Sequence, residues 1–167
     1  MKKTILLFFV LIISCNNQIE LTDNFTLDEI KDGVIYEVNI RQYSESGHFN
    51  EFTKDIPKLR ELGVKILWLM PIHPISKIKR KGTLGSYYSI SDYKQVNPEF
   101  GNKEDLDRLI NEAHKNDMLV ILDWVANHTG WDHSWIKNNP DFYTKNKDGE
   151  ITDPVNPSTG ESWGWTD

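Results

Sequence analysis

The sequence has 167 residues, of which 38% are hydrophobic and 26% are charged, and its formal net charge is −6. These values are ordinary for a globular protein and exclude a disordered chain or a collagen-like repeat. A single cysteine excludes a disulfide-stabilised scaffold. The negative net charge argues against a nucleic-acid partner, because phosphate backbones bind clustered Lys and Arg.

The N-terminal residues follow the order of an export signal. Lys2 and Lys3 are positively charged, residues 5–13 form an apolar run, and Ser14 precedes Cys15. The apolar run is shorter than the roughly 20 residues that a membrane-spanning helix needs. A positive segment, an apolar run, a small residue and a cysteine are the parts of a bacterial lipoprotein signal peptide. The alternative is a buried N-terminal strand with an ordinary core cysteine.

The lipoprotein interpretation predicts how this end of the protein is processed. Residues 1–14 are expected to be removed as the signal peptide, and the Cys15 thiol is expected to be acylated. Two acyl chains on one residue are enough for a stable membrane anchor. Residues 15–31 then form a tether. We therefore predict an exported lipoprotein, anchored to a membrane through Cys15 and facing the periplasm or the cell surface.

The first predicted elements of the domain are a strand, a helix and a second strand. Residues 34–43 alternate β-branched, aromatic and polar side chains, as a strand does. Residues 50–62 carry apolar side chains at helical spacing, and Gly63 follows where a helix favours a left-handed residue. Pro57 is expected to kink this helix or weaken its first turn. Residues 64–70 are nearly all apolar, which is typical of a strand buried on both faces.

A second helix and a third strand follow. The helix is predicted at residues 103–117, with Asn102 as its N-cap and Asp105 three residues further on. Residues 118–123 are predicted to form another buried strand. The order β-α-β-α-β implies an α/β fold with a parallel sheet. Two architectures fit this order: a doubly wound sheet and a (β/α) barrel.

Two long connections favour the barrel. One comprises residues 71–101, between the second strand and its helix, and the other follows the third strand. Both leave the carboxyl ends of strands, where (β/α) barrels build their active sites. No glycine-rich phosphate-binding sequence follows the first strand. A closed eight-stranded barrel takes about 250 residues, so the length allows only part of one.

The two connections also carry the candidate functional residues. In the first, Tyr87 and Tyr88 follow a glycine-containing turn and offer flat, amphipathic faces. In the second, Asp123, Asn127 and His128 emerge directly from the third strand. A carboxylate, an amide and an imidazole there could coordinate a metal or hydrogen-bond sugar hydroxyls. The alternatives are tyrosines packed on the rim of the fold and a polar cap that satisfies backbone groups.

Tryptophan is concentrated after the third strand. Five of the six tryptophans lie within the last 44 residues, at positions Trp124, Trp131, Trp135, Trp163 and Trp165. Large aromatic faces stack well on the C–H face of a sugar ring. A small aromatic core that holds a long insertion together would explain the same residues, and the sequence leaves both interpretations open.

Residues 123–128 (Asp-Trp-Val-Ala-Asn-His) resemble the first signature region of the α-amylase family of glycoside hydrolases. In that region an aspartate ends the third barrel strand and Asn-His follows four residues later. Further segments resemble the family in the expected order: the first strand, the helix-to-strand junction, the end of the second strand, the loop that closes over the sugar, and a segment of the small inserted domain. In this sequence they are residues 34–38, 62–64, 68–72, 88–93 with 97–101, and 163–167.

The resemblance implies a fold and a division into domains. Residues 32–130 would form the N-terminal three β/α units of a (β/α)8 TIM barrel. Residues 131–167 would be the start of the small domain that the family inserts after strand 3, called domain B. The chain ends at Asp167, within that insertion.

The resemblance also implies roles for individual residues. Tyr88 would stack under the sugar ring that is cleaved, His128 would hydrogen-bond the same sugar, and Asp123 would brace the site from the strand end. Asn127 resembles a ligand of the calcium ion that many members bind between the barrel and domain B. Asp167 would be a second ligand, and hard oxygen donors suit this ion.

The family's reaction is the retaining hydrolysis of α-1,4-glucosidic bonds in starch, glycogen or maltooligosaccharides. It uses a carboxylate nucleophile and a carboxylic acid about 5–5.5 Å apart. The resemblance places these groups on the fourth and fifth strands and a third carboxylate after the seventh. No catalytic residue is therefore expected within residues 1–167, and we predict an N-terminal fragment that is inactive alone. The alternative is a non-catalytic glucan-binding surface lipoprotein or a gene remnant.

Overall fold

The computed structural model describes residues 30–163. The predicted signal peptide, the acylated Cys15 and the second calcium ligand Asp167 lie outside the described residues. Contacts divide the chain into Met1–Lys31 and Asp32–Asp167, and the fold below is that of the second unit. Within residues 30–163, no helix is both long enough and apolar enough to cross a membrane.

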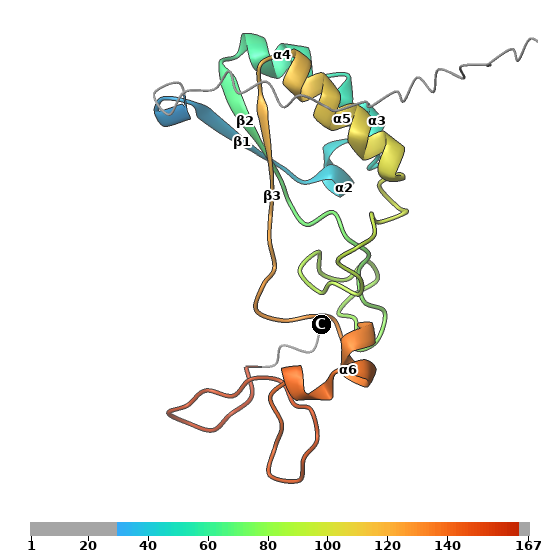
Figure 1. Ribbon diagram of the computed structural model, residues 1–167, viewed down its shortest axis with the longest axis vertical. Helices are drawn as coiled ribbons and strands as arrows, with labels where there is room; N and C mark the ends of the chain where they lie inside the picture. Colours follow the sequence, from blue (N-terminus) through green and yellow to red (C-terminus); the bar gives the residue numbers. More distant parts are fainter. Residues whose placement is uncertain (1–29, 164–167) are drawn as a thin grey trace, which may run out of the picture. The chain divides into compact units, whose positions relative to one another are not determined.

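Three parallel strands form one sheet in the order β1-β2-β3 (Figure 1). Their bounds are Val34–Val38 for β1, Val64–Leu69 for β2 and Leu119–Leu122 for β3. The prediction of a parallel α/β sheet is confirmed. Strands that neighbour one another in chain order are expected in a barrel, whereas a doubly wound sheet reverses its order at a switch point.

The helices form a layer against this sheet. Helix α4 (Ile56–Glu61) contacts β2, and α5 (Lys103–Lys115) contacts β3. Helix α5 also contacts both α4 and α3 (Phe49–Thr53). The buried side chains between the layers form one core, which includes Phe49, Phe52, Ile56, Leu67, Leu69, Phe100, Leu109, Ala113 and Met118.

The first two predicted elements need correction. The strand ends at Val38, and the chain then turns into the short helix α2 (Ile40–Tyr43). The last hydrogen bond of the pairing runs from the amide of Met70, just after β2, to the Val38 carbonyl (3.0 Å). Beyond it the backbone at Asn39 is no longer in the ladder, so the apolar Ile40 is buried by a helical turn instead.

The single helix predicted at residues 50–62 is two helices, α3 and α4, separated at Lys54 and Asp55. Pro57 lies in the first turn of α4, where its missing N–H is not needed. A continuous helix would press its ring against the carbonyl of Thr53, where α3 ends. Gly63 has φ of +90°, as predicted for the residue after this helix.

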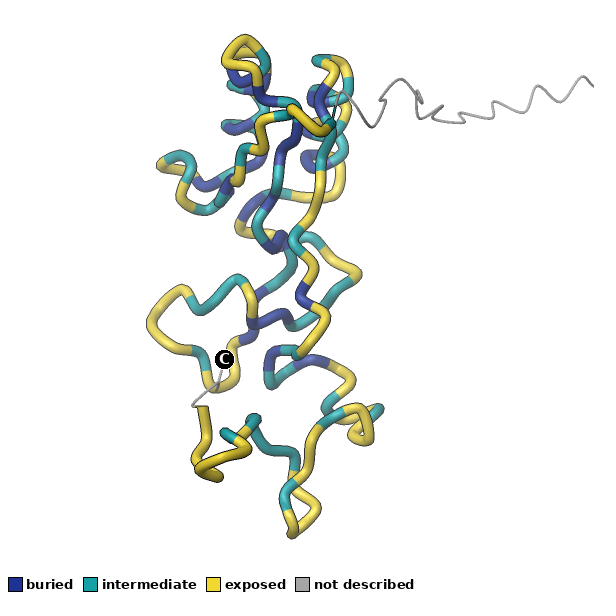
Figure 2. The backbone as a smooth tube through the Cα atoms, turned by 90° about the vertical axis from the view of Figure 1, so that its left-hand side faces the viewer, coloured by how far each residue is buried: buried dark blue, intermediate teal, exposed yellow. Residues whose placement is uncertain are grey.

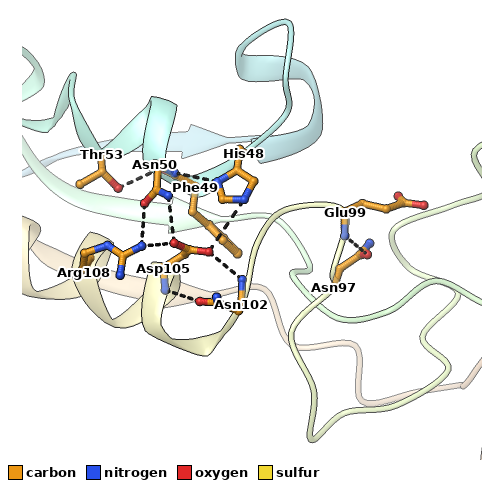
Figure 3. A network of polar contacts seen from close by, with 9 residues as sticks. All are labelled: His48, Phe49, Asn50, Thr53, Asn97, Glu99, Asn102, Asp105 and Arg108. Atoms are coloured by element: carbon orange, nitrogen blue, oxygen red, sulfur yellow. Dashed lines mark hydrogen bonds and ion pairs between the residues drawn. The ribbon is translucent and has the colours of Figure 1, made fainter.

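The predicted N-terminus of α5 is confirmed as a capping box. The Asn102 side chain accepts from the Asp105 amide (2.9 Å), and the Asp105 carboxylate accepts from the Asn102 amide (2.9 Å). The buried Asp105 carboxylate also accepts from Asn50 (2.9 Å) and pairs with Arg108, which ties α5 to α3 (Figure 3). The Asn102 amide, above all, lowers the pKa of Asp105.

Burial is uneven along the sheet. Both faces of β2 are covered, as predicted, but Ile121 and Leu122 of β3 are each 44% exposed. The prediction that β3 is buried on both faces is therefore wrong for these described residues. Strand β2 lies between two strands, whereas β3 is at the edge of the three-stranded sheet. Residues 144–163 contain no buried side chain (Figure 2).

Helix α6 (Ser134–Asn138) and the 3-10 turn η1 (Pro140–Phe142) follow β3 in the second long connection. This connection meets the first one at Gly130, whose amide donates to the Ile90 carbonyl (2.7 Å). A Cβ atom on Gly130 would lie 2.3 Å from the Cβ of Ser76. The close approach of the two connections therefore requires glycine at this position.

We predict that Gly130→Ala destabilises the protein by about 1–3 kcal/mol, the usual cost of overpacking a tight contact. Thermal and chemical denaturation of the purified variant measure the loss. Ser76→Gly removes the atom that the new methyl group would strike. The double variant should therefore be more stable than the sum of the two single effects predicts. Strictly additive losses would show that the contact with Ser76 is not the reason why position 130 requires glycine.

We predict that Asp105→Asn destabilises the protein at neutral pH and that its difference from wild type shrinks in acid. The folded-state pKa of Asp105 is lowered, so the carboxylate contributes its full stabilisation above its unfolded pKa of about 3.9. That contribution is lost as the pH falls through the folded-state value. Denaturant unfolding between neutral pH and pH 3 measures it.

The matched control is Asp107→Asn on the same helix. Asp107 pairs only at the surface with Lys103 (2.6 Å), and exposed ion pairs contribute little. Equal losses in the two variants would contradict the role of the Asp105 network.

Candidate functional site

The candidate site lies where the two long connections leave the sheet. Asp123 follows β3 directly, and its amide donates to the Leu69 carbonyl at the end of β2 (2.9 Å). The parallel pairing is thereby extended by one residue. Because parallel strands end at the same edge of a sheet, the first residues of both connections are brought together here.

Three of the predicted site residues contact one another. The Tyr88 hydroxyl donates to the Asp123 carboxylate (3.2 Å), and the His128 Nε2 lies 3.1 Å from the Tyr88 carbonyl oxygen. A carbonyl can only accept, so this contact places the imidazole proton on Nε2. Burial, and then the Asp123 carboxylate, raise the pKa of Tyr88. Residues from both connections therefore form one hydrogen-bonded cluster, Tyr88–Asp123–His128.

A pocket of about 730 Å³ adjoins this cluster. Its lining includes Asn127 and His128 from the start of the second connection and aromatic side chains from further along it. The volume is in the range that suits a small-molecule ligand. The aromatic residues of the lining are Tyr93, Trp124, Trp131, Trp135, Phe142 and Tyr143.

Three of the tryptophans line the pocket, and Trp135 also belongs to a small aromatic cluster. Trp135 contacts Phe142 edge-on, with ring centroids 5.8 Å apart, and also lies against Tyr93. Trp124 is 69% exposed and lines the pocket. The rings thus form a small aromatic cluster and at the same time present faces to the pocket. Trp163 is exposed and is not among the lining residues, and Trp165 lies outside the described residues.

Of the two predicted calcium ligands, Asn127 lies within the described residues and Asp167 lies outside them. Asn127 is exposed on the pocket wall. Residues 30–163 contain no group of three or more His, Cys, Asp or Glu side chains that could hold a metal ion. Calcium takes six to eight oxygen ligands, which include backbone carbonyls and Asn side chains as well as carboxylates. The calcium site stays a prediction.

Two residues without a predicted role of their own contribute here: Tyr93 lines the pocket, and His133 packs behind it against Tyr93 and Trp135. The Tyr93 hydroxyl oxygen lies 2.6 Å from the carbonyl oxygens of both Val125 and His128. The imidazole of His133 is buried and accepts from the Trp135 amide at the start of α6 (3.1 Å), and burial lowers its pKa. The contacts of Tyr93 are long-range, and that of His133 caps the short helix α6. The only sequence signal for Tyr93 was the resemblance of residues 88–93 to a loop of the family.

The arrangement is suited to binding and orienting a polyhydroxylated ligand. Aromatic faces stack on the apolar face of a sugar ring, and the carboxylate, imidazole and amide side chains match its hydroxyl groups. The groups of the Tyr88–Asp123–His128 cluster already bond one another, which fixes their positions before a ligand arrives.

Comparison with known proteins identifies the family. The family model for the α-amylase catalytic domain matches residues 22–164. Alpha-amylase SusG of Bacteroides thetaiotaomicron is 39% identical over 117 residues, which make up 66% of this chain and 16% of that protein. Trehalose-6-phosphate hydrolase of Bacillus subtilis is 35% identical over 112 residues, or 64% of this chain and 19% of that protein.

Solved structures agree with the family match. The crystal structure of an α-amylase from Lactobacillus plantarum superposes with a TM-score of 0.73 at 41% identity, covering 80% of this chain and 31% of that one. The chain spans less than a third of each of these three proteins. The three parallel strands alternating with helices are consistent with part of the family's TIM barrel. Since the family model covers most of the sequence, the chain belongs to the α-amylase family of glycoside hydrolases.

Proposed function

We propose that this chain is the N-terminal part of an exported enzyme that hydrolyses α-1,4-glucosidic bonds of starch, glycogen or maltooligosaccharides with retention of configuration. The observation that carries the proposal is the Tyr88–Asp123–His128 cluster, which lies at the carboxyl ends of β2 and β3 beside a pocket with aromatic walls. Active sites of barrel enzymes are built at this end of the strands.

Each residue of the cluster has a distinct proposed role in binding. The Tyr88 ring is the stacking face for the glucose unit that is cleaved. Asp123 accepts a hydrogen bond from the Tyr88 hydroxyl and so holds the ring in place. On binding, His128 would transfer its Nε2 hydrogen bond from the Tyr88 carbonyl to a hydroxyl of the same sugar. The carbonyl of Tyr88 keeps that ring oriented before substrate binds. Such preorganised contacts position a substrate without breaking its bond.

Bond cleavage needs groups beyond this cluster. A retaining glycosidase uses two carboxyl groups about 5–5.5 Å apart, one as nucleophile and one as acid/base. We propose that later barrel strands of a longer polypeptide supply both, and that residues 1–167 alone bind substrate without hydrolysing it. A non-catalytic glucan-binding surface lipoprotein or a gene remnant is the second candidate, which the same binding cluster supports.

Two further parts of the proposal rest on the sequence. The signal-peptide pattern supports a lipid anchor on Cys15 and a location in the periplasm or at the cell surface. The family resemblance supports a calcium ion bound by Asn127 and Asp167. Addition of a chelator to the complete polypeptide, followed by thermal denaturation, tests the metal: a calcium site predicts a lower Tm that added Ca²⁺ restores.

We predict that residues 15–167, expressed alone, are poorly soluble and release no reducing sugar from starch. The exposed apolar side chains of Ile121 and Leu122 lie on the edge strand β3, and such edges promote association. Size-exclusion chromatography and a reducing-sugar assay measure the two properties. Starch hydrolysis by a monodisperse preparation of residues 15–167 would contradict the proposal.

The DNA beyond codon 167 provides an independent check. A reading frame that continues into further strand–helix units supports the enzyme. An in-frame stop followed by unrelated sequence supports the remnant or the binding protein.

We predict that Tyr88→Ala lowers kcat/KM of the complete polypeptide on maltooligosaccharides by about tenfold to a hundredfold, because the stacking face is lost. Tyr88→Phe is the matched control, since it keeps the ring and removes only the bond to Asp123. It should lower kcat/KM by about twofold to tenfold. Equal losses in both variants would show that the ring does not stack on substrate.

A further inference from the structure

Tyr93 occupies a central place in the wall of the pocket. Its ring lies 5.6 Å from that of Trp124, 5.5 Å from that of His133 and 5.8 Å from that of Trp135, measured between centroids. These three rings come from the connection after β3, whereas Tyr93 belongs to the connection after β2. The ring of Tyr93 therefore anchors the second connection on the first.

The hydroxyl of Tyr93 makes a contact of a different kind. Its oxygen lies 2.6 Å from the carbonyl oxygen of Val125 and 2.6 Å from that of His128. Both carbonyls are acceptors, and a phenol carries a single proton to donate. The hydroxyl is thus shared between two carbonyls three positions apart, and it defines the turn of backbone between them.

The contact persists over the pH range in which such proteins work. Burial raises the pKa of Tyr93 above its ordinary value of about 10. The phenol therefore stays protonated and remains a donor at neutral pH. Without this donor, the two carbonyl oxygens would face each other with no hydrogen between them, and buried carbonyls without a partner are destabilising.

His128 is consequently held at both ends by the first connection. Its carbonyl is fixed by the Tyr93 hydroxyl, and its imidazole Nε2 is fixed by the Tyr88 carbonyl. Movement of the backbone between Val125 and His128 would shift the imidazole relative to Tyr88. A displacement of about 1 Å at a group that orients substrate can cost on the order of a hundredfold in rate.

We infer that Tyr93 is a positioning residue for α-glucan binding: its hydroxyl sets the backbone of His128, and thereby places the imidazole against the Tyr88 carbonyl. This inference rests on the proposed function, because the sugar-binding roles of Tyr88 and His128 belong to it. The competing interpretation is that Tyr93 only fills the aromatic cluster and stabilises the fold.

The substitution that separates the two interpretations is Tyr93→Phe in the complete polypeptide that the gene encodes. It keeps the ring contacts and removes the shared proton. We expect kcat/KM on maltooligosaccharides to fall by about threefold to tenfold, as for one lost hydrogen bond. Tyr43→Phe is the matched control, because it also removes one phenol hydrogen bond, to Asp55 (2.8 Å), and neither residue lines the pocket. It should leave kcat/KM unchanged.

A double-mutant cycle with His128→Ala tests whether Tyr93 acts through His128. The backbone carbonyl remains in His128→Ala, but no imidazole is left to be positioned. Tyr93→Phe should therefore cause no further loss of kcat/KM in that background, which is a strongly non-additive result. An equal fold-loss in both backgrounds would overturn the inference and leave Tyr93 with a structural role alone.

A readout that does not depend on activity separates this inference from the proposed function. The Nε2 proton of His128, bonded to the Tyr88 carbonyl, is observable by ¹⁵N-edited NMR of the ring. Tyr93→Phe should broaden this signal or speed its exchange with water, and Tyr43→Phe should not. An unchanged signal in Tyr93→Phe overturns the inference, whether or not the protein cleaves glucans. Absence of glucan cleavage with an altered signal would instead contradict only the proposed function.

Discussion

The parallel pairing of β2 with β3 is the constraint on which the rest of the site depends. The last hydrogen bond of that pairing runs from the Asp123 amide to the Leu69 carbonyl (2.9 Å). It brings the starting points of two connections that are more than 50 residues apart in the sequence to one edge of the sheet. Tyr88 and His128 can meet only because both connections begin there. Any change that shifts this register would separate the His128 imidazole from the Tyr88 carbonyl.

The helical layer and the connections beyond the strand ends are stabilised in different ways. At the helical layer, burial of a continuous apolar core is reinforced by the Asp105 carboxylate, which joins α5 to α3. Beyond the strand ends, few apolar side chains are buried, and order comes from individual contacts between the connections. The close approach at Gly130 and the shared hydroxyl of Tyr93 are two of these contacts. The site is therefore more sensitive to single polar or steric changes than the core is.

Local patterns in the sequence were sufficient for much of the fold. The continuous apolar run of β2 and the Asn102–Asp105 capping box are properties of neighbouring residues, and both predictions are confirmed. The break before Pro57 was only half predicted, because helical spacing continues through it. The exposure of β3 depends on which strands flank it, which its own sequence does not encode. The contact of Tyr93 with two distant carbonyls is likewise a tertiary property.

The polar cluster at the strand ends and the exposed edge of β3 have one physical cause in common. In a parallel barrel, each strand contributes its own residues at its carboxyl end, so binding groups and reacting groups can lie on different strands. The connections after β2 and β3 carry the Tyr88 ring, the His128 imidazole and the Asp123 carboxylate. The same β3 leaves Ile121 and Leu122 exposed where a further strand would cover them. Covering that edge would bury apolar surface and bring the next strand's carboxyl end beside Asp123 in a single step. The stability of the sheet and the completion of the site would then depend on the same further strand.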